Sequence, residues 1–583
     1  MYGETPAIES KGFAKMALPE ILPTLLGLLS DQNEDDDEDD WTKSMAAASC
    51  LELLARNVGD AIVQPVVPFV EQGISQADWQ HREAAVMAFG SIIDGPEPST
   101  LAPLVTQAFG ALISMMTSDP SPQVRDTVAW TLGRICEIML ETIDPSIHIE
   151  NLVGALLSGL NTTPRIATSC CHALTQLVNQ INMPHAGDVI PTSPLSSLYP
   201  SVFQALMPLS EKGTNESSSR TAAYNTISAF IASSAQDTLG LIQEVFLAML
   251  ARQEALIGMQ SQLVGSDDRQ NWNDMQVNIC VVIQSVILKS PEMVTAHSDR
   301  IMTNVLQIIS SSGKQSGVLE DAFATVGTLA RESKSGFDKY LEAFNPFLLQ
   351  ALNSYEDWQV CQAAVYVVSD IASAVGPQWT GQAEQIMVCL IEILRSPVIH
   401  RSVKPNAITA IGDLALAIGP AFVPYLQGTM DILSQAGSTT APAADIAMLD
   451  FVWQMREAIV DTFTSILSGI KDQQRECSGR CPSSNGADYP AQAFKPYVSG
   501  IVGFLRNCWV DEEKTDAFCA SLINLLGDFG DTYRRDVRDE LMQEWVQDAV
   551  AYGRSGKGSR SAKDGAAYLQ SVSGACAITC ASR

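Results

Sequence analysis

Carboxylates recur at two fixed positions of a repeating pattern, and they are the side chains best placed to do chemistry. The pattern is registered on a residue that lies eight positions before a Gly or another small residue. One set of acids lies one residue after the register position: Glu83, Asp126, Glu320 and Glu457. A second set lies nine residues after the register position: Asp370, Asp413 and Asp528. An offset of eight residues keeps both sets within roughly 80° on a helix. Each acid alone fits an ordinary solvated face, but the set predicts an acidic stripe that binds a long basic ligand through many modest charge pairs.

A dense acidic run is the second candidate binding feature. Residues 31–40 contain eight acids in ten positions, and Trp41 follows directly. Such density is self-repelling and predicts a solvated loop. A solubilising loop is the simpler interpretation, whereas the neighbouring tryptophan and the acidity of the whole chain favour a docking surface for Lys or Arg. The acids at the centre of this loop are Asp35, Asp36, Asp37, Glu38, Asp39 and Asp40.

Tryptophans follow the same register. Trp79, Trp358 and Trp453 lie three residues before a register position and Trp272 lies four before one. Recurrence at one site predicts a packing role at the turn between paired helices, because aromatic side chains are usually buried. Trp130 differs, since it lies five residues after its register position, where an indole can clamp a guanidinium or an aliphatic stem.

Catalytic patterns are weak or missing. The six histidines are scattered, and none forms an HExxH pair. The pairs Cys477 with Cys481 and Cys576 with Cys580 lack the further ligands of a zinc site. No phosphate-binding glycine loop precedes a predicted helix. We therefore expect no enzyme activity, no cofactor and no metal.

Net charge separates the remaining partner classes. Thirty-six basic and 66 acidic residues leave a net charge of −30, which argues against direct binding of nucleic acid and favours basic proteins. The 13 cysteines lie mostly in apolar helical runs, as expected for buried thiols in a reducing compartment. No run approaches the roughly 18 uninterrupted apolar residues of a membrane span, so we expect a soluble intracellular protein without membrane insertion.

The elements that position these residues are helix pairs. Register positions at Arg82, Arg125 and Arg165 lie 43 and 40 residues apart, and the later spacings that are not lengthened by insertions are 42 or 43. This period is typical of HEAT repeats. We predict an all-α solenoid, a right-handed superhelix of about eleven to twelve antiparallel helix pairs over residues 1–555. Residues 556–583 form a Gly- and Ser-rich tail of uncertain structure, because the helical pattern ends near Arg554.

Several longer blocks carry a family resemblance. They are residues 35–60, Arg82–Gly90, Trp130–Ile135, Tyr340–Phe344, His400–Pro405 and Gly412–Gly419. These blocks closely resemble the importin β family of nuclear import receptors. The similarity runs from about residue 10 to about residue 555 and corresponds to the C-terminal two thirds of that family's chain.

The resemblance implies a set of functional roles. The acidic loop would contact the Ran GTPase and basic cargo. Trp41 and Trp130, with Asp126 beside them, would clamp arginines of the basic N-terminal segment of importin α, and His172 replaces a third family tryptophan. Asp370, Asp413 and the other acids of the stripe, Glu83 included, would form an acidic concave face for the same segment. A site for nucleoporin Phe-Gly repeats would lie on the outer face near Tyr340, Phe344 and Phe347. The expected location is the cytoplasm, the nucleus and the nuclear pores.

A different function is also compatible with the repeats. HEAT proteins serve as scaffold subunits that organise enzyme complexes such as phosphatases. This alternative predicts a folded catalytic partner at one end of the array, but it gives no reason for a tryptophan beside an acidic loop.

Overall fold

Local sequence signals start the helices that carry the candidate residues. Thr42 caps the helix that follows the acidic run, because its hydroxyl accepts a hydrogen bond from the backbone N–H of Met45 at 3.2 Å. Ser121 caps the helix of Trp130 in the same way, with Pro122 at the first helical position. Thr515 caps a third such helix through the N–H of Phe518 at 3.0 Å.

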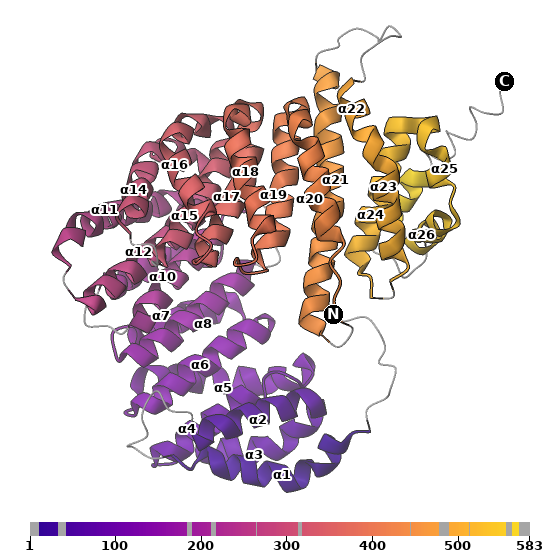
Figure 1. Cartoon of the computed structure of the whole chain (residues 1–583). Coiled ribbons are helices and arrows are strands. Elements are labelled where there is room, and N and C mark those ends of the chain that lie inside the picture. The colour runs from indigo at the N-terminus through magenta and orange to yellow at the C-terminus, as the bar shows by residue number, and fades with distance from the viewer. Residues whose placement is uncertain are drawn as a thin grey trace. The chain divides into compact units, whose positions relative to one another are not determined.

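The computed structural model describes residues 11–32, 42–182, 189–211, 217–263, 265–312, 317–442, 445–476, 489–511, 513–554 and 562–570. Every regular element in these ranges is helical. The chain divides into two compact units, Met1–Met293 and Val294–Arg583. The prediction of an all-α array is confirmed, and each unit is built of helix pairs (Figure 1).

In unit 1, the first helices of the pairs form one layer and the second helices form another. The first layer is α1 (Phe13–Leu29), α3 (Val63–Gly73), α5 (Pro98–Ser118), α7 (Pro145–Gly159), α9 (Tyr199–Glu211) and α11 (Leu239–Met259). The second layer is α2 (Lys43–Val58), α4 (Trp79–Ser91), α6 (Pro122–Ile138), α8 (Pro164–Asn182), α10 (Ser217–Ala232) and α12 (Ser266–Lys289). Each second-layer helix packs on the next, from α2 to α12. The acidic loop therefore lies between the two helices of the first pair.

Unit 2 repeats this layering. Its first layer is α14 (Ser298–Ser311), α16 (Leu341–Leu352), α18 (Ala383–Arg395), α20 (Leu426–Gly437) and α23 (Val498–Trp509). Its second layer is α15 (Val318–Ser333), α17 (Trp358–Val375), α19 (Val403–Ile418), α21 (Ile446–Glu476) and α24 (Asp516–Tyr533). The short helices are α13 (Pro291–Thr295) at the boundary between units, α22 (Tyr489–Phe494) and α25 (Arg538–Leu541). The second-layer helices again pack in succession from α15 to α24.

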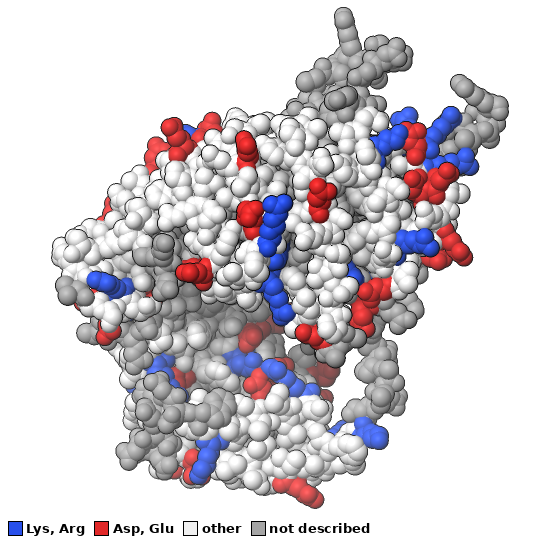
Figure 2. Space-filling view, in the orientation of Figure 1, with Lys and Arg blue, Asp and Glu red and all other residues white. Residues whose placement is uncertain are grey.

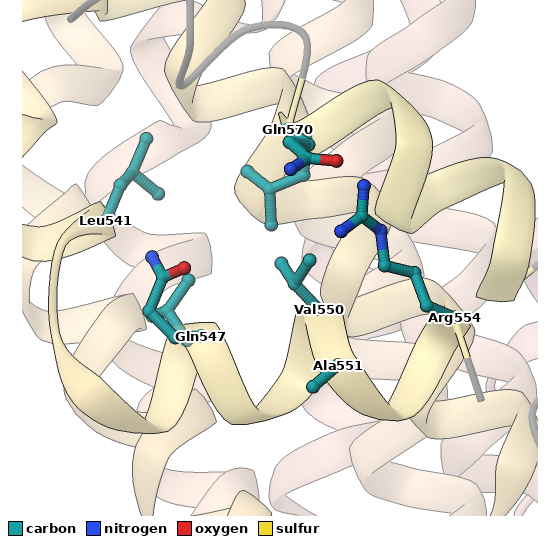
Figure 3. Close-up of a pocket in the computed structure, with 8 residues that line it drawn as sticks. Leu541, Gln547, Val550, Ala551, Arg554 and Gln570 are labelled. Atoms are coloured by element: carbon teal, nitrogen blue, oxygen red, sulfur yellow. The ribbon is translucent and has the colours of Figure 1, made fainter.

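The end of unit 2 contains a helix that the sequence pattern did not predict. Residues 562–570 are helical and lie against α24 and α26 (Glu544–Arg554). Glycines allow this contact: a Cβ on Gly527 would come within 2.6 Å of the Tyr568 ring, and a Cβ on Gly553 within 2.6 Å of the Ala562 carbonyl oxygen. A pocket of about 440 Å³ lies here, lined by Leu541 on one side and by Arg554 and Gln570 on the other (Figure 3).

Short 3-10 segments join each of several second-layer helices to the next first-layer helix. They include η1 (Gly59–Ile62), η7 (Lys334–Tyr340), η8 (Gly376–Gln382), η9 (Gly419–Tyr425) and η11 (Arg534–Val537). Each of these five begins on a residue with positive φ, between 50° and 59°. Three of the five are glycine, which adopts this conformation without a steric penalty.

Three helical stretches are long and apolar enough, by length and composition, to cross a membrane: Pro98–Ser118, Trp358–Arg395 and Val403–Gly437. In this structure their apolar residues serve the repeat packing. α5 buries one face, with Leu101, Val105 and Phe109 among its inward side chains, and α17 and α19 pack on each other. The buried share of the three stretches is 28%, 50% and 56%, so repeat packing uses part of their apolar surface.

Candidate binding surfaces on the second-layer helices

Trp130 and Asp126 form the centre of the candidate site in unit 1. They lie four residues apart on α6 and so share one face of that helix. Trp130 is half-buried, and its ring lies on the backbone of Gly90 in α4. A Cβ on Gly90 would come within 2.4 Å of the ring, so only glycine leaves room for the indole in this position. Local packing thus fixes the tryptophan with part of its ring open.

Two side chains from α8 hold the carboxylate of Asp126. Arg165 donates through Nε to Oδ2 at 2.6 Å, and Ser169 donates through Oγ to Oδ1 at 2.6 Å. The Asp126 side chain is only 13% exposed, whereas the Arg165 side chain is 47% exposed. His172 is exposed and lies three residues after Ser169, on the same side of α8. The structure therefore brings Asp126, Trp130 and His172 onto neighbouring second-layer helices.

Glu83 occupies the register position of Asp126 one repeat earlier, but its environment is different. Its side chain is buried, and it accepts hydrogen bonds from Thr127 Oγ1 at 2.6 Å and from Gln32 Nε2. Burial raises its pKa to about 6, and the two hydrogen bonds oppose that shift. The carboxylate thus joins α4, α6 and Gln32, the second residue of the acidic run, and it does not face a ligand in this conformation.

The acidic loop and Trp41 lie mostly outside the described residues, which stop at Gln32 and resume at Thr42. Both edges of the loop are anchored. Lys43 Nζ pairs with Asp31 at 3.0 Å, and Gln32 Nε2 donates to the Leu29 carbonyl oxygen at 2.9 Å. The described residues on the two sides, Asp31 and Gln32 before and Lys43 after, are therefore held by contacts of their own.

Asp370 and Asp413 form the corresponding group in unit 2. They lie on the adjacent helices α17 and α19, and both are half-buried. Burial raises both pKa values; the Arg331 guanidinium, 3.3 Å from Asp370, opposes the shift at Asp370, and the negative charge of Asp413 adds to it. Ser369 on α17 donates a hydrogen bond to Asp413. The two acids repel each other and are only partly compensated.

The structure extends this acidic group to residues that the register did not select. Asp461 lies exposed on α21 and accepts a hydrogen bond from Ser521 of α24. Asp321 on α15 is half-buried, and burial raises its pKa to about 6. Asp528, which the register did select, lies on α24, and burial raises its pKa as well. Three aspartates, Asp126, Asp413 and Asp461, accept a hydrogen bond from a serine on the neighbouring second-layer helix. A serine at that position is the sequence signal that could have found Asp461.

Of the four tryptophans that follow the register, two are buried and two are half-buried. Trp272 and Trp453 are buried, and Trp272 donates to the Leu256 carbonyl oxygen at 2.8 Å. Their predicted packing role is confirmed, but both lie inside the helices α12 and α21 and not at the turn between paired helices. Trp79 and Trp358 are half-buried, and the Trp358 ring stacks on His400 with centroids 4.5 Å apart.

The three residues predicted to bind Phe-Gly repeats have unequal exposure. Phe344 is fully buried against Phe323 in the core of unit 2. Tyr340 is buried and donates its hydroxyl to Asp299. Only Phe347 is partly exposed. Phe344 and Tyr340 therefore position α16 in this conformation and do not offer an open surface.

An apolar groove lies elsewhere in the first layer, between α1 and α3. It has a volume of about 520 Å³ and is lined by Leu18, Pro19, Leu22, Pro23, Leu26, Gly27, Pro65 and Phe69. Sequence reasoning did not single out these residues, because their spacing is the ordinary apolar pattern of a packed helix. In α1 the outward side chains Phe13 and Met16 are also 68% and 66% exposed.

The described residues contain no group of three or more His, Cys, Asp or Glu side chains that could hold a metal ion. Figure 2 shows small groups of acidic and basic side chains separated by wide uncharged areas on the face in view. The candidate binding features are therefore local: half-buried acids, the half-buried Trp130 beside Asp126, and an apolar groove.

An array of helix pairs in two layers, with register acids on the second layer, is an α-solenoid of the HEAT-repeat class. A family model described as "Importin subunit beta-1-like, TPR repeats" matches residues 151–554, and a HEAT-like repeat model matches residues 79–135. The chain belongs to the importin β family, whose members are transport receptors and not enzymes.

Curated relatives and solved structures agree with this assignment. The chain is 37% identical over 563 residues to importin subunit beta-1 of Schizosaccharomyces pombe and 31% identical to that of Saccharomyces cerevisiae, covering 96% and 97% of this chain and 63% of each relative. A crystal structure of importin beta matches with a TM-score of 0.90 at 33% identity, covering 98% of this chain and 65% of that one. The "Kap95:Nup1 complex" matches with a TM-score of 0.82 at 30% identity, covering 98% and 64%. The chain thus spans less than two thirds of the length of these relatives.

Proposed function

We propose that this chain is the ligand-binding part of a nuclear import receptor that holds a basic segment on its second-layer helices. The ligand is the basic N-terminal segment of importin α, or the basic segment of a cargo protein. The observation that carries the proposal is the group on α6 and α8, where a partly open Trp130 lies beside Asp126 and the exposed His172.

The contacts of Asp126 suggest how a ligand arginine binds. Arg165 already supplies a guanidinium to this carboxylate at 2.6 Å and is half exposed. A ligand guanidinium over the Trp130 ring can take the place of Arg165, because both make the same charge-assisted hydrogen bond. The ligand thereby gains the aromatic face of Trp130 in addition to the carboxylate.

In unit 2, Asp370, Asp413, Asp461 and Asp528 supply the second acidic group for the same kind of ligand. Burial raises the pKa values of Asp370, Asp413 and Asp528, and neighbouring groups compensate this burial only in part. A lysine or arginine from the ligand would relieve that cost. Part of the binding energy therefore comes from charges that the free receptor leaves poorly paired.

Two further partners follow from the family. Structures of relatives are titled as complexes of Kap95 with Nup1 and with RanGDP. We propose that Phe-Gly repeats of nucleoporins contact first-layer grooves, with Phe347 and the α1–α3 groove as the open apolar surfaces, and that the acidic loop at residues 31–40 contacts Ran in part. The corresponding location is the cytoplasm, the nucleus and the nuclear pores. No observation favours the phosphatase-scaffold alternative.

Titration calorimetry with a synthetic importin α basic segment tests the main proposal. Binding should be saturable and should weaken steeply between low and high salt, since Lys and Arg contacts to carboxylates are screened. A matched peptide with its basic residues replaced by glutamine is the control and should not bind. Affinity that stays flat across the salt range, or equal binding of the control peptide, contradicts the proposal.

A further inference from the structure

Tyr366 on α17 occupies the same register position as Trp130 on α6. Trp130 lies five residues after the register residue Arg125, and Tyr366 lies five residues after the register residue Cys361. The Tyr366 side chain is 51% exposed, which is unusual for an aromatic residue in a packed helix array. Unit 2 therefore carries an exposed aromatic ring at the position where unit 1 carries its candidate tryptophan.

Hydrogen bonds hold the Tyr366 ring in place. Its hydroxyl oxygen accepts from Gln362 Nε2 of α17 at 3.0 Å and from Asn406 Nδ2 of α19 at 3.1 Å. Asn406 Nδ2 also donates to the Ser402 carbonyl oxygen at 3.2 Å, which orients the amide. The ring is thus tied to two adjacent helices although it is exposed, and little conformational entropy is lost when a ligand stacks on it.

The neighbouring helices leave the ring uncovered. The residue at the same register position is Ala324 on α15 and Thr409 on α19, and both are small and exposed. α15 and α19 are the second-layer helices that pack on the two sides of α17. A large exposed ring between two small residues presents an open aromatic face to a ligand.

Two carboxylates lie about one helical turn from this ring. Asp370 follows Tyr366 by four residues on the same face of α17, and Arg331 of α15 donates to it at 3.3 Å. Asp413 of α19 accepts a hydrogen bond from Ser369, which follows Tyr366 by three residues. The Arg331 side chain is 50% exposed. As in unit 1, an exposed guanidinium of the chain already pairs with the acid and can give way to a guanidinium of a ligand.

An aromatic face beside a carboxylate distinguishes arginine from lysine. The planar guanidinium can stack on a ring and still donate hydrogen bonds from its edge to a carboxylate. The compact ammonium of lysine is strongly hydrated and makes these two contacts less well together. A ring and an acid four residues apart on one helix face therefore favour arginine.

We propose that Tyr366, Asp370 and Asp413 form an arginine-selective subsite for the basic ligand. A ligand guanidinium stacks on the Tyr366 ring and pairs with Asp370 in place of Arg331, and a neighbouring basic residue of the ligand pairs with Asp413. The subsite rests on the proposed function for the identity of its ligand. It adds a requirement for arginine over lysine in unit 2.

Titration calorimetry with two versions of the importin α basic segment tests the subsite. One version keeps its arginines, and in the other every arginine is replaced by lysine. Tyr366→Leu should weaken the arginine segment about fivefold to tenfold and the lysine segment by less than about twofold. Tyr366→Phe keeps the ring and should keep the preference for arginine. Tyr425→Leu, at a half-buried tyrosine of η9 before the first-layer helix α20, is the matched control and should bind both segments normally.

Two outcomes overturn the subsite and leave the proposed function standing. One is unchanged affinity of the arginine segment in Tyr366→Leu. The other is an equal loss for both segments, which is the result of a merely structural role.

Failure of the unaltered chain to bind the arginine segment overturns the proposed function instead, and a second pair of probes then tests the subsite alone. Hexa-arginine and hexa-lysine peptides are compared in the Trp130→Ala background, so that the aromatic ring of unit 1 does not contribute. Hexa-arginine should bind more tightly than hexa-lysine, and Tyr366→Leu should abolish that preference. Equal binding of the two peptides before Tyr366 is changed overturns the subsite.

Discussion

At the residue scale, Trp130 owes its availability to a neighbour that does not touch the ligand. The indole lies on the backbone of Gly90, and any side chain there would collide with it. Trp130→Ala should weaken binding of the importin α segment by about 2 kcal/mol, as expected for an aromatic anchor. Calorimetry measures this. Gly90→Ala should weaken binding as well by displacing the ring, whereas Trp509→Ala on the first-layer helix α23 should not. Unchanged affinity in Trp130→Ala would return this residue to a packing role.

Glu83 is a buried register acid whose ionisation should make the stability of the chain depend on pH. Its pKa is raised to about 6 from an ordinary value of 4.5 by burial. Above pH 6 the carboxylate is ionised in both the folded and unfolded chain, and burial then costs stability; below pH 4.5 it is neutral in both. Relative to Glu83→Gln, the unaltered chain should therefore gain about 2 kcal/mol as pH falls from above 6 to below 4.5.

Denaturant midpoints of the two proteins, compared at each pH, check this prediction. Taking the difference between variant and unaltered chain removes the titration of the many other acids. A difference that is constant over the whole range would show that Glu83 is not buried in the ionised form.

Sequence reasoning could place Glu83 and Asp126 in register but could not separate them. Both follow an arginine and precede a run of buried apolar residues. Their environments differ because Gln32 and Thr127 cover Glu83, whereas Arg165 and Ser169 hold Asp126 with 13% of its side chain exposed. Gln32 is 51 residues away from Glu83 in the chain, and no local pattern identifies such a partner.

At the scale of elements, the turns between repeats give a clean prediction. η1, η8 and η9 begin on glycine with φ between 57° and 59°, but η7 begins on Lys334 with φ of 51°. A non-glycine residue in this conformation carries backbone strain. Lys334→Gly should therefore raise stability by about 1 kcal/mol, measured by denaturant unfolding. The reciprocal change, Gly376→Lys, should lower stability, and an unchanged midpoint in both variants would contradict the strain.

The helices, their pairing and the position of Trp130 in the second layer could be predicted from the sequence, because each pair repeats the same apolar period. The helix at residues 562–570 could not be predicted in this way. It is short, it contains Gly565, and it follows a Ser- and Gly-rich segment, so its intrinsic propensity is low. It forms because α24 and α26 offer Gly527 and Gly553 as contact points. Tertiary packing outweighs local propensity here, and a single sequence does not reveal the packing.

That dependence is testable. Gly527→Val places a branched side chain where the Tyr568 ring lies, and should release residues 562–570 from α24. Amide hydrogen exchange by mass spectrometry should then show loss of protection in this helix while α15 and α17 keep theirs. Gly154→Val, at an open position of α7, controls for the effect of valine in a helix. Full protection of residues 562–570 in Gly527→Val would contradict the packing account.

At the scale of the whole molecule, the negative net charge favours binding of a basic ligand but lowers the stability of the free chain. With 66 acidic and 36 basic residues, the excess negative charge of the free chain repels itself. The half-buried Asp370 and Asp413 add a local cost, because burial and mutual repulsion raise the pKa of Asp370. These are also the acids proposed to hold the basic ligand. Substitutions that remove these poorly compensated acidic charges should therefore stabilise the folded chain.

The double variant Asp370→Asn with Asp413→Asn separates the two effects. At pH 7 its thermal midpoint should rise, because the raised pKa of each acid means that the ionised form is disfavoured in the folded state. Its affinity for the importin α basic segment should fall by about 1 kcal/mol at low salt and by less at high salt. Asp338→Asn with Glu342→Gln removes the same charge from exposed positions beside the first layer. If this control matched both shifts, net charge alone would explain them and the second-layer acids would have no special role.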